Sequence, residues 1–88
     1  MAAYRVLIPP KVKQQIAVIA EPFRRRIMDA AVALADNPRP HGAVKLKGNT
    51  GEYRIRIGDY RVIYLIEDRT ITVTVNKVSR RDDAYRKH

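Results

Sequence analysis

The residues most able to do chemistry in this chain are arginines that share one face of a predicted β-hairpin. Across residues 53–57, apolar residues alternate with Arg54 and Arg56, which is the period of two expected of a half-buried strand. Gly58-Asp59 is a two-residue hairpin turn signal, and the register it sets places Arg56 opposite Arg61. Guanidinium groups gathered in this way could bind phosphate oxygens through paired hydrogen bonds.

Like charges directly opposite one another destabilise a sheet, so we expect the arginines to serve an anion outside the fold. Other cations could extend such a site: Lys45 and Lys47 before the hairpin, and Arg80 and Arg81 after the last predicted strand. Tyr85 could stack on an unpaired base, an interaction of about 1–3 kcal/mol per base. Two interpretations stay open from spacing alone. One is an RNA site suited to attack by the 2′-hydroxyl of the RNA, and the other is a solvated basic face with Tyr85 packed under the tail.

The composition indicates a partner that carries many negative charges. The chain has 18 Lys and Arg residues against 9 Asp and Glu residues, with a net charge of +9 at pH 7. Such a balance is typical of proteins that bind nucleic acid, an acidic protein or an anionic membrane surface. With 88 residues, the chain has room for a single domain, 1–88.

Other kinds of site find little support in the sequence. The absence of cysteine excludes disulfides and thiolate chemistry. His41 and His88 have no partners at metal-ligand spacing, so we expect neither a metal nor another cofactor.

The sequence shows no sign of a membrane segment. No run approaches the roughly 18 apolar residues of a membrane span. The first residues are charged and interrupted by Pro9-Pro10, unlike a signal segment, so we expect a cytoplasmic protein without membrane contact.

The elements that must position the arginines follow from the apolar periodicity. Residues 3–8 predict a short strand, which Pro9-Pro10 ends. Two helices with apolar stripes follow and should form an antiparallel hairpin, the second ending at Asn37-Pro38. A loop over 39–51 leads to three predicted strands, at 52–57, 60–67 and 70–78.

A second two-residue turn is predicted at Asp68-Arg69 between the last two strands. The resulting register makes one face of the sheet apolar, with the pairs Val62–Val75, Tyr64–Val73 and Ile66–Ile71. The other face then pairs Arg61 with Asn76, Ile63 with Thr74 and Leu65 with Thr72. The apolar face should pack on the helices. The predicted fold class is α+β with the order β-α-α-β-β-β, a small, largely antiparallel sheet on a two-helix hairpin.

These motifs, in this order, resemble the RelE family of toxins from type II toxin–antitoxin systems, within the wider RelE/ParE superfamily. The segments that carry the resemblance are DNPRP at 36–40, KLKG at 45–48, YRIRIGDYRVIY at 53–64 and VSRRDDAYR at 78–86. The resemblance covers nearly the whole chain. It implies a RelE-like microbial ribonuclease fold.

The resemblance also implies a toxin that inhibits translation. Members of the family are metal-independent endoribonucleases (mRNA interferases) that cut mRNA in the ribosomal A site, next to 16S rRNA. The 2′-hydroxyl attacks the adjacent phosphate, which leaves a cyclic phosphate and a free 5′-hydroxyl. A cognate RelB-like antitoxin neutralises such a toxin, and we expect the complex of the two to be oligomeric.

The resemblance assigns roles to individual residues of this chain. The catalytic residues would be Arg54, Arg56, Arg61, Arg81 and Tyr85. Arg61 would hold the scissile phosphate, and Arg54 and Arg56 would stabilise the charge that develops on it. Arg81 would support the leaving oxygen, and Tyr85 would stack on a base. RNA-binding roles fall to Lys45, Lys47 and Arg80.

The general base is an open question in this assignment. Arg54 and Arg56 occupy strand positions at which the family often has lysine, and arginine does not readily release its proton. Either Lys45, Lys47 or Tyr85 takes the proton, or the reaction depends mainly on charge stabilisation and in-line positioning.

Two alternatives from other functional classes remain. A ParE-like toxin would share the fold but inhibit DNA gyrase through protein contact, and that branch generally lacks the RNA-cleaving residues. A catalytically inactive RelE homologue would bind RNA without cutting it, and arginine at the usual lysine positions is compatible with this alternative.

Overall fold

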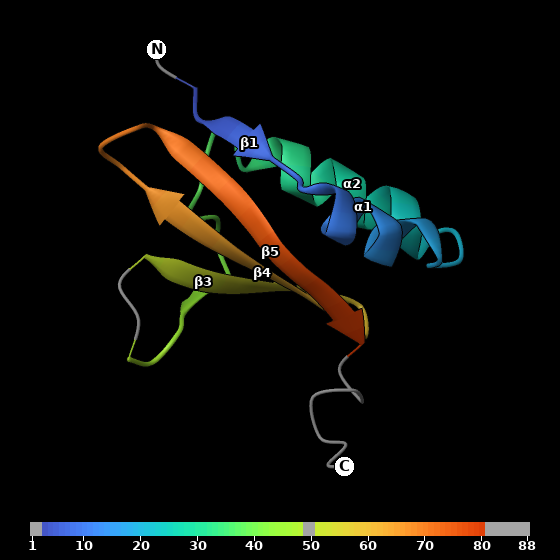
Figure 1. Ribbon diagram of the computed structural model, residues 1–88. Helices are drawn as coiled ribbons and strands as arrows, with labels where there is room; N and C mark the ends of the chain where they lie inside the picture. Colours follow the sequence, from blue (N-terminus) through green and yellow to red (C-terminus); the bar gives the residue numbers. More distant parts are fainter. Residues whose placement is uncertain (1–2, 49–50, 81–88) are drawn as a thin grey trace.

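Two helices cover one face of a five-stranded sheet in the computed structural model, which describes residues 3–48 and 51–80 (Figure 1). The elements are β1 (Arg5–Leu7), α1 (Pro10–Ala17), α2 (Phe23–Ala33), β2 (Val44–Lys45), β3 (Glu52–Ile57), β4 (Tyr60–Glu67) and β5 (Thr72–Arg80). The strand order in the sheet is β1-β5-β4-β3-β2. Only β1 and β5 pair in parallel among the described strands, so the predicted α+β class and largely antiparallel sheet are confirmed.

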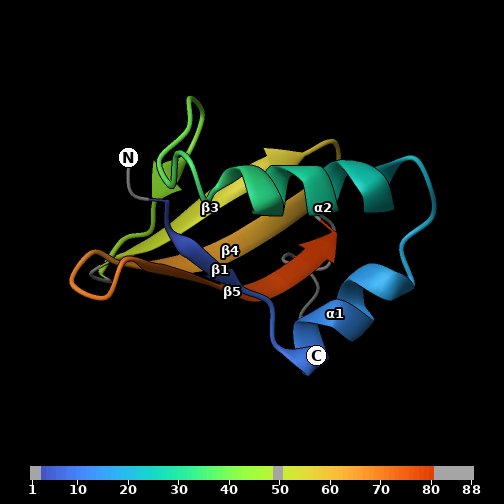
Figure 2. The ribbon, with the colours of Figure 1, turned by 90° about the horizontal axis from the view of Figure 1, so that it is seen from above.

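The helices form where the apolar stripes predict them. Pro10 occupies the first turn of α1, where a missing N–H removes no helical hydrogen bond. Figure 2 shows the chain reversing between α1 and α2, as expected of a helical hairpin. Neither helix is long and apolar enough to cross a membrane, among the residues that the structure describes.

A single apolar core fills the space between the helices and the sheet. Its buried residues are Val12, Ile16, Ile19, Ile27, Ala31 and Leu34 from the helical half, and Ile55, Val62, Tyr64, Ile66, Val73, Val75 and Val78 from the strands. Complete burial of one such side chain contributes about 1.5–3 kcal/mol. The strand members alternate along β4, so the predicted apolar face is confirmed as the one that packs on the helices.

The hairpin between β3 and β4 has the predicted register. Ile57 pairs with Tyr60 and Arg56 with Arg61 across a turn at Gly58-Asp59. Gly58 has a φ of +59°, and a Cβ at this position would collide with the ring of Phe23. Glycine therefore permits both the turn conformation and its close approach to the first turn of α2.

The predicted register between β4 and β5 is wrong. The structure pairs Glu67 with Thr72, so the connection contains the four residues 68–71 instead of Asp68-Arg69 alone. The predicted apolar pairs are replaced by Tyr64–Val75, Ile66–Val73 and Val62–Val78, and the predicted polar pairs by Arg61–Ser79, Ile63–Lys77 and Leu65–Thr74. The pairs of Arg61, Val62 and Ile63 are shifted by one residue more than the others. This extra shift comes from a β-bulge next to Ile63 and Tyr64, which leaves Asn76 as the extra residue of β5.

Tertiary contacts explain the longer loop. The Asp68 carboxylate accepts hydrogen bonds from Tyr4 Oη at 2.6 Å and from Arg39 Nη2 at 3.0 Å. Ile71 adopts a φ of 51°, which is rare for a β-branched residue. Neither feature has the glycine or asparagine signal of a tight turn, so the local sequence does not reveal this conformation.

Several element boundaries also differ from expectation. β1 is shorter than the predicted strand 3–8, α2 ends at Ala33 and not at Asn37-Pro38, and β5 begins at Thr72 and not at residue 70. The short strand β2 lies inside the region 39–51 that was predicted as loop, and it pairs with β3 through Val44–Arg54 and Lys45–Tyr53. The last strand extends to Arg80 instead of ending near residue 78. This extension carries β5 alongside the whole length of β4.

Candidate nucleic-acid interface

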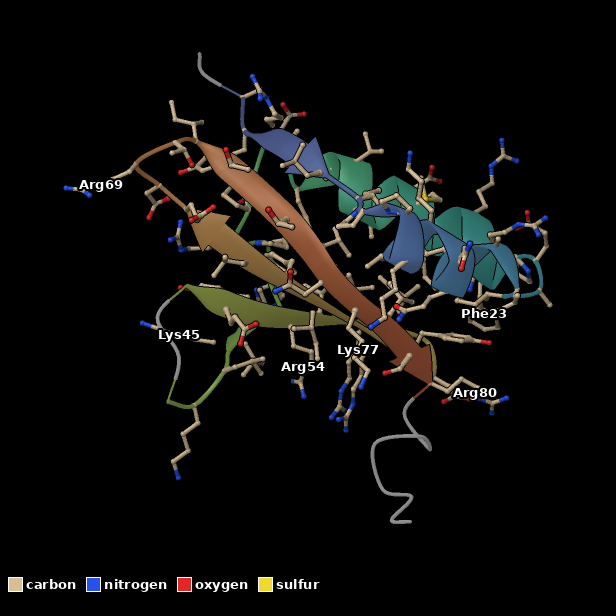
Figure 3. All side chains as sticks on the ribbon, in the orientation of Figure 1. Phe23, Lys45, Arg54, Arg69, Lys77 and Arg80 are labelled. Carbon is tan, nitrogen blue, oxygen red and sulfur yellow. The ribbon has the colours of Figure 1, made fainter. Side chains whose placement is uncertain are left out.

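Four cationic side chains lie close together on the sheet face opposite the helices: Arg54 and Arg56 on β3, Arg61 on β4 and Lys77 on β5. Register partners share a face of the sheet, and so do residues two apart along a strand. The pairing gives two neighbouring rows, Arg54–Ile63–Lys77 and Arg56–Arg61–Ser79. Figure 3 shows Arg54 and Lys77 pointing away from the helices on this side of the sheet. We call these four residues the basic cluster.

The four positions of the basic cluster are neighbours in the sheet. Neighbouring strands lie about 4.8 Å apart, and residues on one face of a strand repeat every ~7 Å. The Nε atoms of Arg54 and Arg61 are buried, so the stems of these side chains lie against the sheet. Arg56 and Lys77 are exposed. The arrangement concentrates positive charge at a surface that a polyanion can reach.

An acidic side chain borders the basic cluster. Glu52 precedes Arg54 by two residues on the same face of β3. Its carboxylate accepts a hydrogen bond of 3.2 Å from Asn76 Nδ2, which comes from the bulge in β5. This contact links β3 to β5 across β4 and fixes the position of a negative charge beside the cations.

Lys77 was missed by the sequence analysis. Its place depends on the β-bulge, which brings it opposite Ile63 and next to the row of Arg61. The available signal was the adjacent pair Asn76 and Lys77, two polar residues in succession between Val75 and Val78. Such a break in alternation is typical of a bulge in an otherwise regular strand.

Three predicted RNA-binding residues lie apart from the basic cluster. Lys45 is the register partner of Tyr53, so it projects on the helix side of the sheet. Arg80 is the partner of Tyr60, and Figure 3 shows it at the end of β5, directed away from Arg54 and Lys77. Lys47 is exposed in the loop that follows β2. Arg81 and Tyr85 lie outside the described residues.

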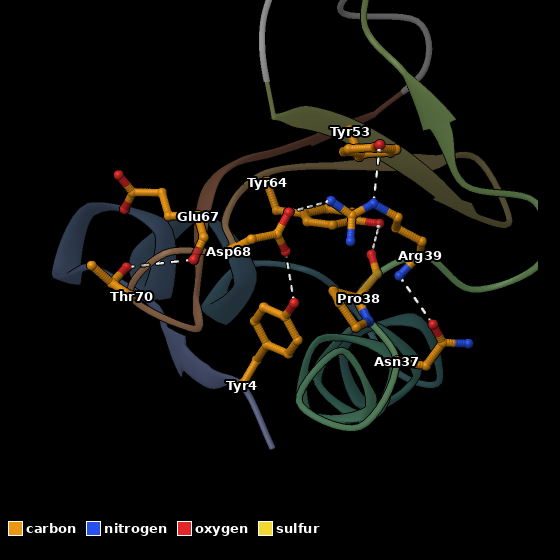
Figure 4. A network of polar contacts seen from close by, with 9 residues as sticks. All are labelled: Tyr4, Asn37, Pro38, Arg39, Tyr53, Tyr64, Glu67, Asp68 and Thr70. Carbon is orange, nitrogen blue, oxygen red and sulfur yellow. Dashed lines mark hydrogen bonds and ion pairs between the residues drawn. The ribbon is translucent and has the colours of Figure 1, made fainter. Parts of the chain in front are cut away.

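A polar network behind the sheet fixes the strands that carry the cluster (Figure 4). Arg39, from the loop after α2, donates from Nε to Tyr53 Oη at 3.1 Å and from Nη2 to Asp68 at 3.0 Å. Its guanidinium carbon lies 5.3 Å from the centre of the Tyr53 ring, within cation–π range. One side chain therefore connects β3 with the loop between β4 and β5.

Two pKa shifts accompany this network. The hydrogen bond from Tyr4, followed by that from Arg39, lowers the pKa of the Asp68 carboxyl. Burial raises the pKa of the Tyr64 hydroxyl to about 12. This hydroxyl donates to the Pro38 carbonyl at 2.8 Å, so it is both buried and satisfied.

The described residues offer no set of metal ligands. Within 3–48 and 51–80, no group of three His, Cys, Asp or Glu side chains could hold a metal ion. His41 is exposed in the loop after α2. The chemistry available to the basic cluster is the binding of anions and the stabilisation of negative charge.

Comparisons with known proteins agree on one superfamily. The family model described as "ParE toxin of type II toxin-antitoxin system, parDE" matches residues 6–85. A candidate RelE1 toxin of Methanocaldococcus jannaschii is 31% identical over an alignment of 88 positions, which covers 94% of this chain and 96% of that protein.

Solved structures agree with this result. The RelE–RelB complex from Pyrococcus horikoshii contains a chain with a TM-score of 0.80 and 30% identity, covering 90% of this chain and 96% of that one. The isolated RelE toxin of E. coli has a TM-score of 0.77 and 22% identity, covering 89% of this chain and 84% of that one, and supports the fold alone. The chain therefore belongs to the RelE family of toxins, within the RelE/ParE superfamily of type II toxin–antitoxin systems.

Proposed function

We propose that this toxin is a metal-independent endoribonuclease that cuts mRNA on the ribosome and so inhibits translation. The observation that carries the proposal is the basic cluster, in which cations from three adjacent strands converge on one exposed face. The fold has no need of this arrangement, because it opposes like charges across a sheet. A bound phosphate would remove the repulsion.

The proposed chemistry is attack of a ribose 2′-hydroxyl on the adjacent phosphate. Negative charge builds on the phosphate oxygens in the transition state, and preorganised cations stabilise that charge more than they stabilise the ground state. Arg61 would hold the scissile phosphate, while its partner Arg56 and the neighbouring Arg54 would stabilise the developing charge. Arg81 and Tyr85 keep the roles implied by the family, at the leaving oxygen and at a stacked base.

The proposed partners follow from the family and from the charge of the chain. The Pyrococcus horikoshii structure contains RelE bound to RelB. We infer that a RelB-like antitoxin neutralises this chain in an oligomeric complex. A net charge of +9 favours approach to the ribosome, where the toxin would meet mRNA beside 16S rRNA in the cytoplasm.

The ends of the cleaved RNA test the proposed reaction. We expect a 5′-hydroxyl that accepts phosphate from polynucleotide kinase, and a 2′,3′-cyclic phosphate on the upstream fragment. Ends that carry a 5′-phosphate would contradict attack by the 2′-hydroxyl, because that reaction leaves the phosphate on the upstream side.

A second candidate function is favoured by the family model itself, whose description names ParE toxins. A ParE-like toxin would act on DNA gyrase through protein contact. Its activity should survive loss of Arg56 and Arg61, and it should produce gyrase-dependent DNA breaks. A third outcome, RNA binding without cleavage, would identify an inactive RelE homologue.

A further inference from the structure

The proposed reaction needs a group that removes the proton from the attacking 2′-hydroxyl, and this inference rests on that proposed function. Arginine keeps its proton in proteins, so the three arginines of the basic cluster cannot supply the base. A lysine can serve as a base when it is neutral. The question is which lysine lies close enough to Arg61, the proposed phosphate ligand.

Lys45 and Lys47, the two lysines that the sequence suggests as bases, do not lie next to Arg61. Lys45 projects on the helix side of the sheet, as the partner of Tyr53. Lys47 lies in the loop beyond Glu52, outside the two rows of the basic cluster. Neither position adjoins Arg61 in the sheet.

Lys77 does adjoin it. Arg61 pairs with Ser79, and Lys77 is two residues before Ser79 on the same face of β5. Diagonal neighbours of this kind lie about 7–8 Å apart, which is within reach of two long side chains that meet at one phosphate. The β-bulge creates this position, since without it Asn76 would pair with Ile63 and Lys77 would pair with Val62 on the core face.

We propose that Lys77 is the general base of this toxin and that its neutral Nζ removes the proton from the 2′-hydroxyl. The O2′–P bond forms as the P–O5′ bond breaks, and the departing O5′ takes a proton from water. The products are the 2′,3′-cyclic phosphate and the 5′-hydroxyl. Lys77 is protonated at the end of the step and returns its proton to solvent.

The charged residues that share the sheet face with Lys77 come from the neighbouring strands β3 and β4. Arg54 and Arg56 come from β3, and Arg61 comes from β4. Glu52 also comes from β3, where Asn76 holds its carboxylate. On the opposite side, Gln15 of α1 accepts from the Val78 N–H at 2.8 Å and carries no charge. Because the other three members of the basic cluster are arginines, which keep their protons, Lys77 is the member that can exchange a proton with the substrate.

The chain contains no cysteine, which allows a site-specific test of this role. Lys77→Cys introduces the only thiol, and 2-bromoethylamine converts that thiol into a lysine analogue with sulfur in place of one methylene. Cleavage of mRNA in a translation reaction is measured for the wild type, K77C, aminoethylated K77C and Lys77→Arg. Wild-type protein treated with the same reagent is the control for alkylation elsewhere.

We expect K77C to cut at least about 100-fold more slowly than the wild type, because general acid–base catalysis contributes at least about that factor to the rate. Aminoethylation should restore cleavage, whereas K77R should not, although it keeps the positive charge. The amine of the analogue is more acidic than that of lysine, so the restored rate should rise at a lower pH than the wild-type rate. Thermal denaturation confirms that each variant is folded, which the exposure of Lys77 favours.

Two results would overturn the role of Lys77 alone. The first is cleavage by K77R within a few-fold of the wild-type rate, which would show that only the charge matters. The second is aminoethylated K77C that stays inactive while treated wild type remains active. Absence of cleavage by the wild type itself would overturn the proposed function and, with it, the role of Lys77.

Discussion

Arg56 of β3 and Arg61 of β4 are direct register partners on the sheet face opposite the helices. Opposed like charges in an antiparallel pair cost about 0.2–1 kcal/mol relative to neutral residues. In the next row, Arg54 and Lys77 flank Ile63 and add to the local positive potential. The site is therefore built at the expense of stability, as is common where function requires charge that the fold does not need.

The first prediction concerns this opposition of charges. Arg56→Thr should raise the free energy of unfolding by about 0.2–1 kcal/mol, because it removes one of the opposed cations and threonine favours strands. Urea denaturation measures the change. Arg69→Thr is the matched control, because Arg69 is exposed in the β4–β5 loop and lies far from Arg54 (Figure 3). A loss of stability in R56T relative to R69T would contradict the account.

The second prediction concerns the salt dependence of RNA binding. Each phosphate contact on a single strand contributes about −0.7 to the slope of log K against log salt. Arg61→Gln should therefore reduce the magnitude of that slope by about 0.7, whereas Arg69→Gln should leave it unchanged. Fluorescence anisotropy with a labelled RNA oligonucleotide, titrated at several salt concentrations, gives both slopes. Equal slopes for the two variants would show that Arg61 does not contact phosphate.

The third prediction concerns Tyr64 at alkaline pH. Burial raises the pKa of its hydroxyl to about 12, so the folded state resists ionisation that the unfolded state undergoes near pH 10. The stabilising effect is complete below pH 10 and decreases as the pH rises through the folded-state value. Tyr64→Phe should lose about 1 kcal/mol at neutral pH, because it removes the bond to the Pro38 carbonyl.

Denaturation of wild type and Y64F between pH 8 and 12 separates these effects. The stability of the wild type should fall toward that of Y64F across the alkaline range. Parallel curves for the two proteins would contradict a raised pKa at Tyr64.

The fourth prediction concerns Asp68 at acid pH. Hydrogen bonds from Tyr4 and Arg39 lower the pKa of its carboxyl in the folded state. Its stabilising contribution is therefore present above the unfolded-state value of about 3.9 and is lost as the pH falls through the lower folded-state value. Asp68→Asn should remove this part of the acid dependence. Thermal unfolding of both proteins from pH 2 to 6 tests it, and identical pH profiles would refute it.

The sequence was sufficient where a turn fixes the geometry locally. Gly58-Asp59 leaves two residues between β3 and β4, so the positions of Arg54, Arg56 and Arg61 followed directly and were confirmed. The apolar face was also predictable, because alternation in β4 identifies it independently of the partner strand. The arginine cluster could therefore be derived from residue order alone.

The rest depended on contacts between distant parts of the chain. The loop at 68–71 takes its shape from Asp68 bonding to Tyr4 and Arg39, which are far away in sequence. The bulge that brings Lys77 into the basic cluster offsets β5 against β4, and the choice of a bulge over a regular register is decided by packing. The side of the sheet to which Lys45 projects likewise required the pairing of β2 with β3.

The most direct test of the central claim is primer extension on an mRNA incubated with the toxin, with and without translating ribosomes. Arg61→Ala and the matched control Arg69→Ala are assayed beside the wild type, after thermal denaturation has shown that all three are folded. We predict in-frame cuts that require ribosomes, appear with wild type and R69A, and disappear with R61A. Undiminished cuts with R61A, or no cuts from folded wild-type protein, would contradict an RNA-cleaving site built on the basic cluster.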